Sequence, residues 1–198
     1  MASGWQSMDE AAEYGLGLLV GERVRLRALA NEDLPDLERW WLHPSTVALV
    51  ANTIRPMPPG PIADMFRNWS KNETSSSVGF CIESLDTAQL LGHASLWSDT
   101  PRNRDAMLAI IVGVEHTGAG YGTDAIRVLL RYGFAEMGLH RVELGVYAYN
   151  TRAHAIYRSL GFTEEGRRRE VVLHDGVFHD EIIMSMLEPE WRATLLRG

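Results

Sequence analysis

The sequence predicts one mixed domain of α-helices and β-strands, an α+β fold organised around a single sheet. The 198 residues suit one domain with a sizeable core. Segments in which every second residue is apolar, as in strands, are interleaved with segments of helical spacing. Over residues 106–149 an apolar strand, a helix and an alternating strand follow one another. This order predicts a crossover between two parallel strands.

The first half of the chain begins with a strand pattern and then alternates helices and strands. We expect a strand at 22–29, helices at 31–42 and 62–70, and strands at 78–84 and 90–98. Four prolines within residues 52–62 exclude regular structure there and predict a connector.

The second half contains the most regular patterns. Residues 106–114 are almost entirely apolar, which is typical of a strand covered on both faces. A helical stripe runs from Ile126 to Met137 and is expected to end at Gly138. We then expect a strand at 141–149, a short helix ending at Gly161, and a hairpin over 170–187 that turns at Asp175 and Gly176.

Residues 21–189 are expected to form the domain, with residues 1–20 as a frayed extension and 190–198 as a tail. The start of the chain has acidic residues and no basic cluster before its apolar run, unlike a signal peptide. No window reaches the roughly 18 apolar residues of a membrane span. We therefore expect no membrane association.

Charge and cysteine content limit the classes of binding partner and the cellular compartment that we expect. Twenty-six acidic and 19 basic residues give a formal charge of −7, which argues against a nucleic-acid surface and mildly favours cationic partners. The single cysteine, Cys81, lies in an apolar stretch, so we expect it to be buried. A lone cysteine cannot form an internal disulfide, which indicates the reducing cytoplasm.

Gly118, Gly120 and Gly122 link a buried strand to a helix. The first N-H groups of a helix lack internal partners and bind anions, and glycines let a diphosphate approach the backbone. The alternative is a tight turn without a ligand. No Lys follows Gly122, which excludes a P-loop. An NAD-dependent oxidoreductase needs an acidic residue about 20 positions after the glycines, and Glu143 lies near that distance. However, too few strands follow the loop for the doubly wound sheet of such enzymes.

Two motifs together resemble the GNAT superfamily of acyl-CoA-dependent N-acetyltransferases, especially its ribosomal-protein-alanine N-acetyltransferase branch. One is the glycine loop, and the other is "YNTRAHAIYRSLGF", with Asn150, Tyr157 seven residues later, and then Gly-Phe. The resemblance runs from Glu22 to Leu187. It implies a mixed sheet of six to seven strands with splayed central parallel strands and about four helices.

The resemblance also implies a binding site for acetyl-CoA. Its residues would be Val112, Thr117, Gly118, Ala119, Gly120, Tyr121, Gly122, Thr123, Asn150 and Arg158. Backbone amides of the loop would hold the pyrophosphate, while the Val112 backbone would pair with the pantetheine arm and face the thioester oxygen. Asn150 would contact the pantetheine amide, and Arg158 or Arg152 the nucleotide phosphates. Many members have Arg or Gln where this chain has Thr117.

For catalysis, the resemblance implies that Tyr157 protonates or orients the departing thiolate. A base must also supply the neutral amine. Many relatives in this branch have Glu where this chain has Met107. The remaining candidates are Glu115 and Asp99, with His116, His93 and Ser95 behind them. The seven histidines include no HExxH pattern, so no metal site is expected.

The expected reaction is direct transfer of an acetyl group to a primary amine within a ternary complex. The acceptor is left open between a protein N-terminus, a polyamine, an aminoglycoside-like molecule and another small amine. Four tryptophans are candidates for the acceptor pocket or the core, namely Trp40, Trp41, Trp69 and Trp97. A catalytically impaired acyl-CoA sensor is the alternative, because the usual Glu is absent. Many relatives pair as dimers, which implies a homodimer.

Overall fold

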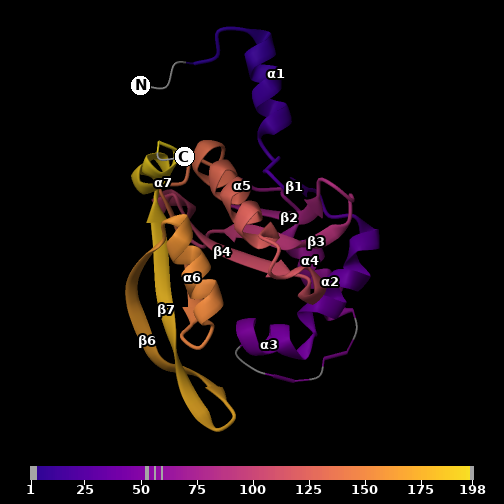
Figure 1. Ribbon diagram of the computed structural model, residues 1–198, viewed down its shortest axis with the longest axis vertical. Helices are drawn as coiled ribbons and strands as arrows, with labels where there is room; N and C mark the ends of the chain where they lie inside the picture. Colours follow the sequence, from indigo (N-terminus) through magenta and orange to yellow (C-terminus); the bar gives the residue numbers. More distant parts are fainter. Residues whose placement is uncertain (1–3, 52–53, 56, 59, 197–198) are drawn as a thin grey trace.

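A seven-stranded mixed sheet forms the centre of the molecule (Figure 1). The computed structural model describes residues 4–51, 54–55, 57–58 and 60–196. The strands are β1 (Val24–Arg27), β2 (Ser77–Ser84), β3 (Leu90–Trp97), β4 (Asp105–Val112), β5 (Arg141–Tyr147), β6 (Thr163–His174) and β7 (Val177–Leu187). Their spatial order is β1-β2-β3-β4-β5-β7-β6, and in the described chain only β4 and β5 pair in parallel. The predicted mixed sheet is confirmed.

The described residues form seven α-helices, more than the four expected. They are α1 (Met8–Gly17), α2 (Leu34–Trp41), α3 (Pro44–Val50), α4 (Pro61–Trp69), α5 (Tyr121–Ala135), α6 (Thr151–Leu160) and α7 (Glu188–Leu195). The additional helices are α1, α3 and α7, of which α3 and α7 have fewer than nine residues. Within the described ranges no helix has the length and apolar character needed to cross a membrane.

The helices divide between the two faces of the sheet. The larger core contains apolar residues of α5, α6 and α7 together with Ala94, Leu96 and Leu108 from the central strands. The smaller core joins α2 and α4 to Cys81 and Ile111, which face the other way. Because side chains alternate along a strand, β2, β3 and β4 contribute to both cores. Cys81 is fully buried, as predicted.

The amino-terminal segment contains an ordered helix where a frayed extension was expected. In Figure 1 α1 projects from the body, and none of its residues is buried. Its first turn is capped by Ser7, whose side chain accepts a hydrogen bond from the Glu10 N-H. At its other end the Arg131 guanidinium donates to the Gly17 and Leu18 carbonyls at 2.7 and 2.6 Å. End capping, which no apolar stripe reveals, accounts for this helix.

β4 and β5 separate soon after they begin. They pair through three residue pairs, Asp105 with Arg141, Ala106 with Val142 and Met107 with Glu143. Further along β4, the Gly113 N-H donates to the Leu91 carbonyl on the β3 side at 2.8 Å. Because N-H groups alternate sides along a strand, those of Ile110 and Val112 point into the gap towards β5. The predicted splay of the central strands is confirmed.

Asp124 fastens the first strand to the start of α5. It is buried, and its carboxylate accepts backbone N-H groups of Glu22, Arg23 and Val24 at 3.2, 2.8 and 3.1 Å. A side chain at Gly21 would collide with this carboxylate. The contact therefore positions the segment before β1 beside the glycine loop.

The hairpin of β6 and β7 turns where the sequence predicted. His174 pairs with Val177, so that Asp175 and Gly176 form the two-residue turn, with φ values of 50° and 72°. Positive φ at both positions is the requirement of the type I′ turn that Asp-Gly favours.

Replacing Asp124 with Asn should lower the free energy of unfolding by about 1 to 3 kcal/mol, because an amide oxygen cannot accept hydrogen bonds from all three N-H groups as the two carboxylate oxygens do. Urea denaturation measures the effect. Asp64→Asn is the matched control, since the Asp64 side chain is exposed on α4 and pairs with the exposed Arg67. Equal unfolding midpoints for the two variants would contradict the role assigned to Asp124.

Candidate functional site

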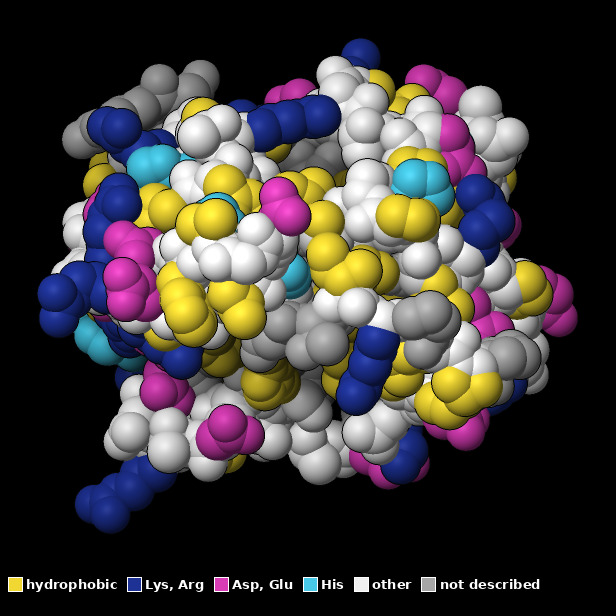
Figure 2. Space-filling view, turned by 90° about the horizontal axis from the view of Figure 1, so that it is seen from below, with side chains coloured by type: hydrophobic (Ala, Val, Ile, Leu, Met, Phe, Trp, Pro, Cys, Tyr) yellow, Lys and Arg dark blue, Asp and Glu magenta, His cyan; other side chains and the backbone are white. Residues whose placement is uncertain are grey.

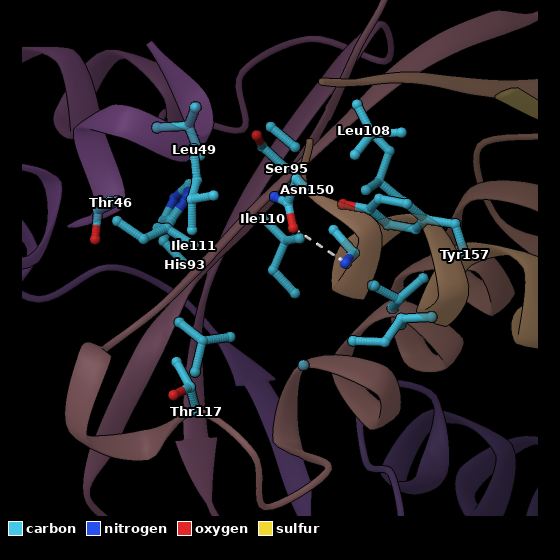
Figure 3. A pocket seen from close by; sticks show the side chains of 18 of the residues that line it. Thr46, Leu49, His93, Ser95, Leu108, Ile110, Ile111, Thr117, Asn150 and Tyr157 are labelled. Carbon is cyan, nitrogen blue, oxygen red and sulfur yellow. Dashed lines mark hydrogen bonds between the residues drawn. The ribbon is translucent and has the colours of Figure 1, made fainter. Parts of the chain in front are cut away.

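A cavity of about 990 Å³ occupies the gap between β4 and β5 (Figure 3). The second half of β4, the glycine loop and the first turn of α5 line one part of it. Side chains of α6 line another part, and side chains of α3, α4 and β3 line the opposite side. The volume lies at the upper end of the usual range for ligand sites, which suits two substrates held together.

The glycine loop presents backbone to this cavity. Among its residues Thr117, Gly118 and Gly120 contribute to the lining, as do Tyr121, Gly122 and Thr123 in the first turn of α5. Gly118 and Gly120 have φ values of 91° and 84°, a backbone conformation that favours glycine. The Thr117 hydroxyl donates to the Val114 carbonyl at 3.1 Å. The loop therefore directs peptide groups and the start of a helix towards the cavity, an arrangement that binds anions.

Two arginines flank the loop. Arg152 lines the cavity, and its Nη2 lies 3.6 Å from the position that a Cβ at Gly118 would take. On the other side the Arg23 guanidinium donates to the Ala119 carbonyl and lies over the Tyr121 ring, 5.9 Å from its centroid. Both guanidinium groups increase the positive potential at the loop.

Of the remaining residues predicted to bind the cofactor, two lie outside the lining of the cavity. Ala119 is part of the loop, but it is engaged through its carbonyl by Arg23. Arg158 is exposed on α6. Arg23 was missed because its pattern is that of a solvent-facing strand residue, and its contact with Ala119 spans 96 residues of sequence.

Asn150 and Tyr157 both line the cavity, as Figure 3 shows. Asn150 precedes α6, and its side chain accepts the Ala153 N-H at 3.2 Å. Tyr157 extends its hydroxyl into the cavity, while its ring packs edge-on against Phe162. Burial raises the pKa of Tyr157 to about 12. At neutral pH the hydroxyl is therefore protonated and presents a donor to the cavity.

Neither of the two carboxylates named as candidate bases lines the cavity. Glu115 accepts hydrogen bonds from Arg39 at 2.7 Å and from the Trp40 indole at 2.9 Å. The Arg39 contact chiefly lowers the pKa of Glu115 to about 2, which makes it a weak base. Asp99 is exposed in the turn after β3. The positions of both residues argue against the role considered for them.

His93, Ser95 and His116 do line the cavity, as does Met107. His93 is buried beside Phe66, and its Nε2 lies 2.8 Å from the Ser70 hydroxyl. Burial lowers the pKa of His93 to about 4, so the imidazole is neutral at physiological pH and a weak base.

Aromatic side chains form a wall on the α4 side of the cavity. Trp41, Trp69 and Trp97 line it, whereas Trp40 is buried in the smaller core. The ring centroids of Trp41 and Trp69 lie 5.5 Å apart, and the interplanar angle is 70°. Each of the two rings also contacts Phe66. Their mutual packing holds these rings in place.

Glu181 is a cavity residue that sequence analysis missed. It lies on β7, opposite Tyr147 of β5, and its carboxylate crosses the neighbouring Gly145. A Cβ at Gly145 would collide with this carboxylate, so the absence of a side chain at Gly145 leaves room for the Glu181 carboxylate. Glu181 resembles any polar residue of an alternating strand, and only the pairing of β5 with β7 brings it to the cavity.

Comparison with known proteins agrees with this geometry. Residues 23–163 match the family model described as an acetyltransferase (GNAT) domain. The Bacillus subtilis protein YdaF, whose name places it among ribosomal N-acetyltransferases, is 34% identical over 104 residues, 52% of this chain and 57% of YdaF. A spermidine N(1)-acetyltransferase of Vibrio cholerae is 31% identical over 102 residues, 52% of this chain and 59% of that protein. The matched segments span little more than half of these two relatives.

Among solved structures, the spermidine N-acetyltransferase of Vibrio cholerae in complex with CoA and spermine is similar to this chain. The TM-score is 0.75 at 25% identity, and the alignment covers 85% of this chain and 98% of that one. The likeness therefore extends over the whole domain rather than a single motif.

The free energy of unfolding should fall as the pH drops from 7 to 5 because of His93. Burial holds its folded-state pKa at about 4, below the ordinary 6.5, so the unfolded chain binds a proton that the folded chain excludes. The contribution of His93 to the free energy of unfolding is therefore almost fully present above pH 6.5 and is lost as the pH falls towards 4. At pH 5 the free energy of unfolding should be lower by about 2 kcal/mol.

Urea denaturation at pH 7, 6 and 5 measures this loss. In His93→Gln the decline should be much smaller, whereas His140→Gln, at an exposed position, should retain it. The same decline in wild type and His93→Gln would show that another group is responsible.

Proposed function

The chain belongs to the GNAT acetyltransferase family, and from this premise we propose that it transfers an acetyl group from acetyl-CoA directly to a primary amine. The observation that carries the proposal is the unpaired edge of β4 beside the anion-binding loop. An extended ligand with amide groups can add to such an edge as a strand would, while its diphosphate meets the loop. The pantetheine arm and pyrophosphate of CoA have these two features.

The residues present fit this cofactor. The N-H groups of Ile110 and Val112 point into the gap and need partners, since buried backbone donors are rarely left unpaired. Loop amides with Arg152 and Arg23 nearby suit the phosphates, and Asn150 keeps its amide group at the cavity while capping α6. Acetyl-CoA would supply the acetyl group as a thioester.

The proposed chemistry needs a neutral amine, a stabilised oxyanion and a proton for sulfur. The amine nitrogen attacks the thioester carbon, and the Val112 N-H donates to the oxygen that gains negative charge. When the carbon–sulfur bond breaks, Tyr157 gives its proton to the thiolate, and water restores it. The nitrogen releases its extra proton to solvent, so charge and atoms balance. A pKa of about 12 keeps Tyr157 protonated until this step.

The sensor alternative rests on Met107, which lines the cavity where many relatives have Glu. The protonated hydroxyl of Tyr157, which points into the same cavity, supports turnover instead. We further propose a cytoplasmic enzyme, which the free and buried Cys81 supports. A homodimer, implied by the resemblance, remains a prediction.

Gly118→Asp should raise the dissociation constant for acetyl-CoA by about 10-fold or more. The new carboxylate would stand where the diphosphate is proposed to bind, and like charges repel strongly at such short range. Titration calorimetry measures the affinity. Gly138→Asp is the control, because Gly138 also has positive φ but lies beyond the other end of α5. Unchanged affinity in Gly118→Asp would rule out this position for the pyrophosphate.

Tyr157→Phe should lower kcat by roughly 10- to 1000-fold and leave acetyl-CoA affinity nearly unchanged, because it removes only the proton donor. Thiol release under saturating substrates measures kcat, and calorimetry measures affinity. An unchanged kcat would remove Tyr157 from the mechanism. Tight acetyl-CoA binding without turnover of any amine by the wild-type protein would favour the sensor.

A further inference from the structure

We propose that the acceptor is a primary monoamine with an apolar or aromatic body, and that Glu181 receives its ammonium group. This inference rests on the proposed acetyl transfer and specifies its second substrate. It follows from which face of the sheet the acceptor occupies, what covers that face, and how much negative charge is present there.

We call the part of the cavity lined by α3, α4 and β3 the acceptor half. It lies on the face of the sheet covered by α2, α3 and α4. Ala94, Leu96 and Leu108 point to α5 on the other face. Their neighbours His93, Ser95 and Met107 therefore face α2–α4, and all three line the cavity. Tyr157 reaches the gap from α6, on the α5 side. An amine that enters from the α3 side would thus meet the thioester from the face opposite Tyr157.

Glu181 belongs to this acceptor face. Ile182 and Met184 of β7 point into the core under α5, so their neighbour Glu181 points the other way. Gly145 and Tyr147 of β5 share that face, and the carboxylate lies against Gly145 beside the gap. The Glu181 side chain is 18% exposed and is paired with the exposed Arg168 at 2.8 Å. Only one of its oxygens, Oε2, is used by Arg168.

Apart from neutral polar side chains such as Thr46, His93 and Ser95, the acceptor half is lined by apolar groups. Trp41, Trp69 and Trp97 contribute aromatic surface, and Leu49 and Val50 of α3 contribute aliphatic surface. Figure 2 shows hydrophobic side chains across the middle of the lower face of the molecule, with most carboxylates towards its margin. Burying an apolar body against such a wall contributes roughly 25 cal/mol for each Å² removed from water.

The described lining offers a carboxylate to one ammonium group at most, because Glu181 already shares its charge with Arg168. Among the described residues Glu181 is the single Asp or Glu of the lining, although the chain as a whole carries a charge of −7. A polyamine would bring several ammonium groups, and each one buried without a partner would cost several kcal/mol. The excess acidic residues therefore lie elsewhere, and the lining selects against polycations.

The experiment measures thiol release with tryptamine, 2-phenylethylamine, putrescine and spermidine as acceptors. We expect kcat/KM for the two aromatic amines to exceed that for spermidine by at least about 10-fold. In Glu181→Gln the KM for tryptamine should rise about 10- to 100-fold, as expected for loss of a charged contact, with acetyl-CoA affinity unchanged. Gly145→Ala should act in the same direction by displacing the carboxylate.

Glu164→Gln is the matched control, because Glu164 is an ion-paired carboxylate on the adjacent strand β6 but does not line the cavity. Preference for spermidine, or an unchanged KM for tryptamine in Glu181→Gln, would overturn the inference while leaving acetyl transfer intact. Acetyl-CoA binding without turnover of any of the amines would instead overturn the proposed function, and with it this substrate class.

Discussion

The separation of β4 from β5 is the constraint on which the rest of the structure depends. Three residue pairs hold the strands together at one end, and beyond them the peptide groups of β4 are left facing an open gap. A sheet normally leaves no such groups in its interior, because an unpaired buried N-H is costly. The cavity, the glycine loop at its edge and the side chains of α6 all gather at this interruption.

The interruption also joins the two faces of the sheet. The cofactor half is built from the end of β4, the start of α5 and α6, and it is fastened by Asp124 to the segment before β1. The acceptor half is built from α3, α4 and β3, with Glu181 at its border. Charge differs accordingly, since Arg23 and Arg152 lie beside the loop, whereas the described lining of the opposite half combines apolar and neutral polar side chains with one carboxylate.

Sequence patterns predicted the sheet and four of the helices, because these elements bury periodic apolar faces. They did not predict α1, α3 or α7, whose formation depends on capping and on neighbours rather than on a stripe. Motif spacing led to Asn150 and Tyr157 since both lie on one short helix and its cap. Arg23 reaches the loop across 96 residues of sequence, and Glu181 reaches the cavity through the pairing of β5 with β7, so no local pattern indicates either residue.

The two halves of the cavity also occupy different stretches of the chain. Apart from Glu181 and nearby β5 residues, the acceptor wall comes from residues 41–111, while the cofactor half comes from residues 110–157. Mutations that reshape α3 and α4 can therefore alter the acceptor wall without altering the residues proposed to bind acetyl-CoA. Such a division allows one scaffold to diversify its chemistry by drift in its amino-terminal half.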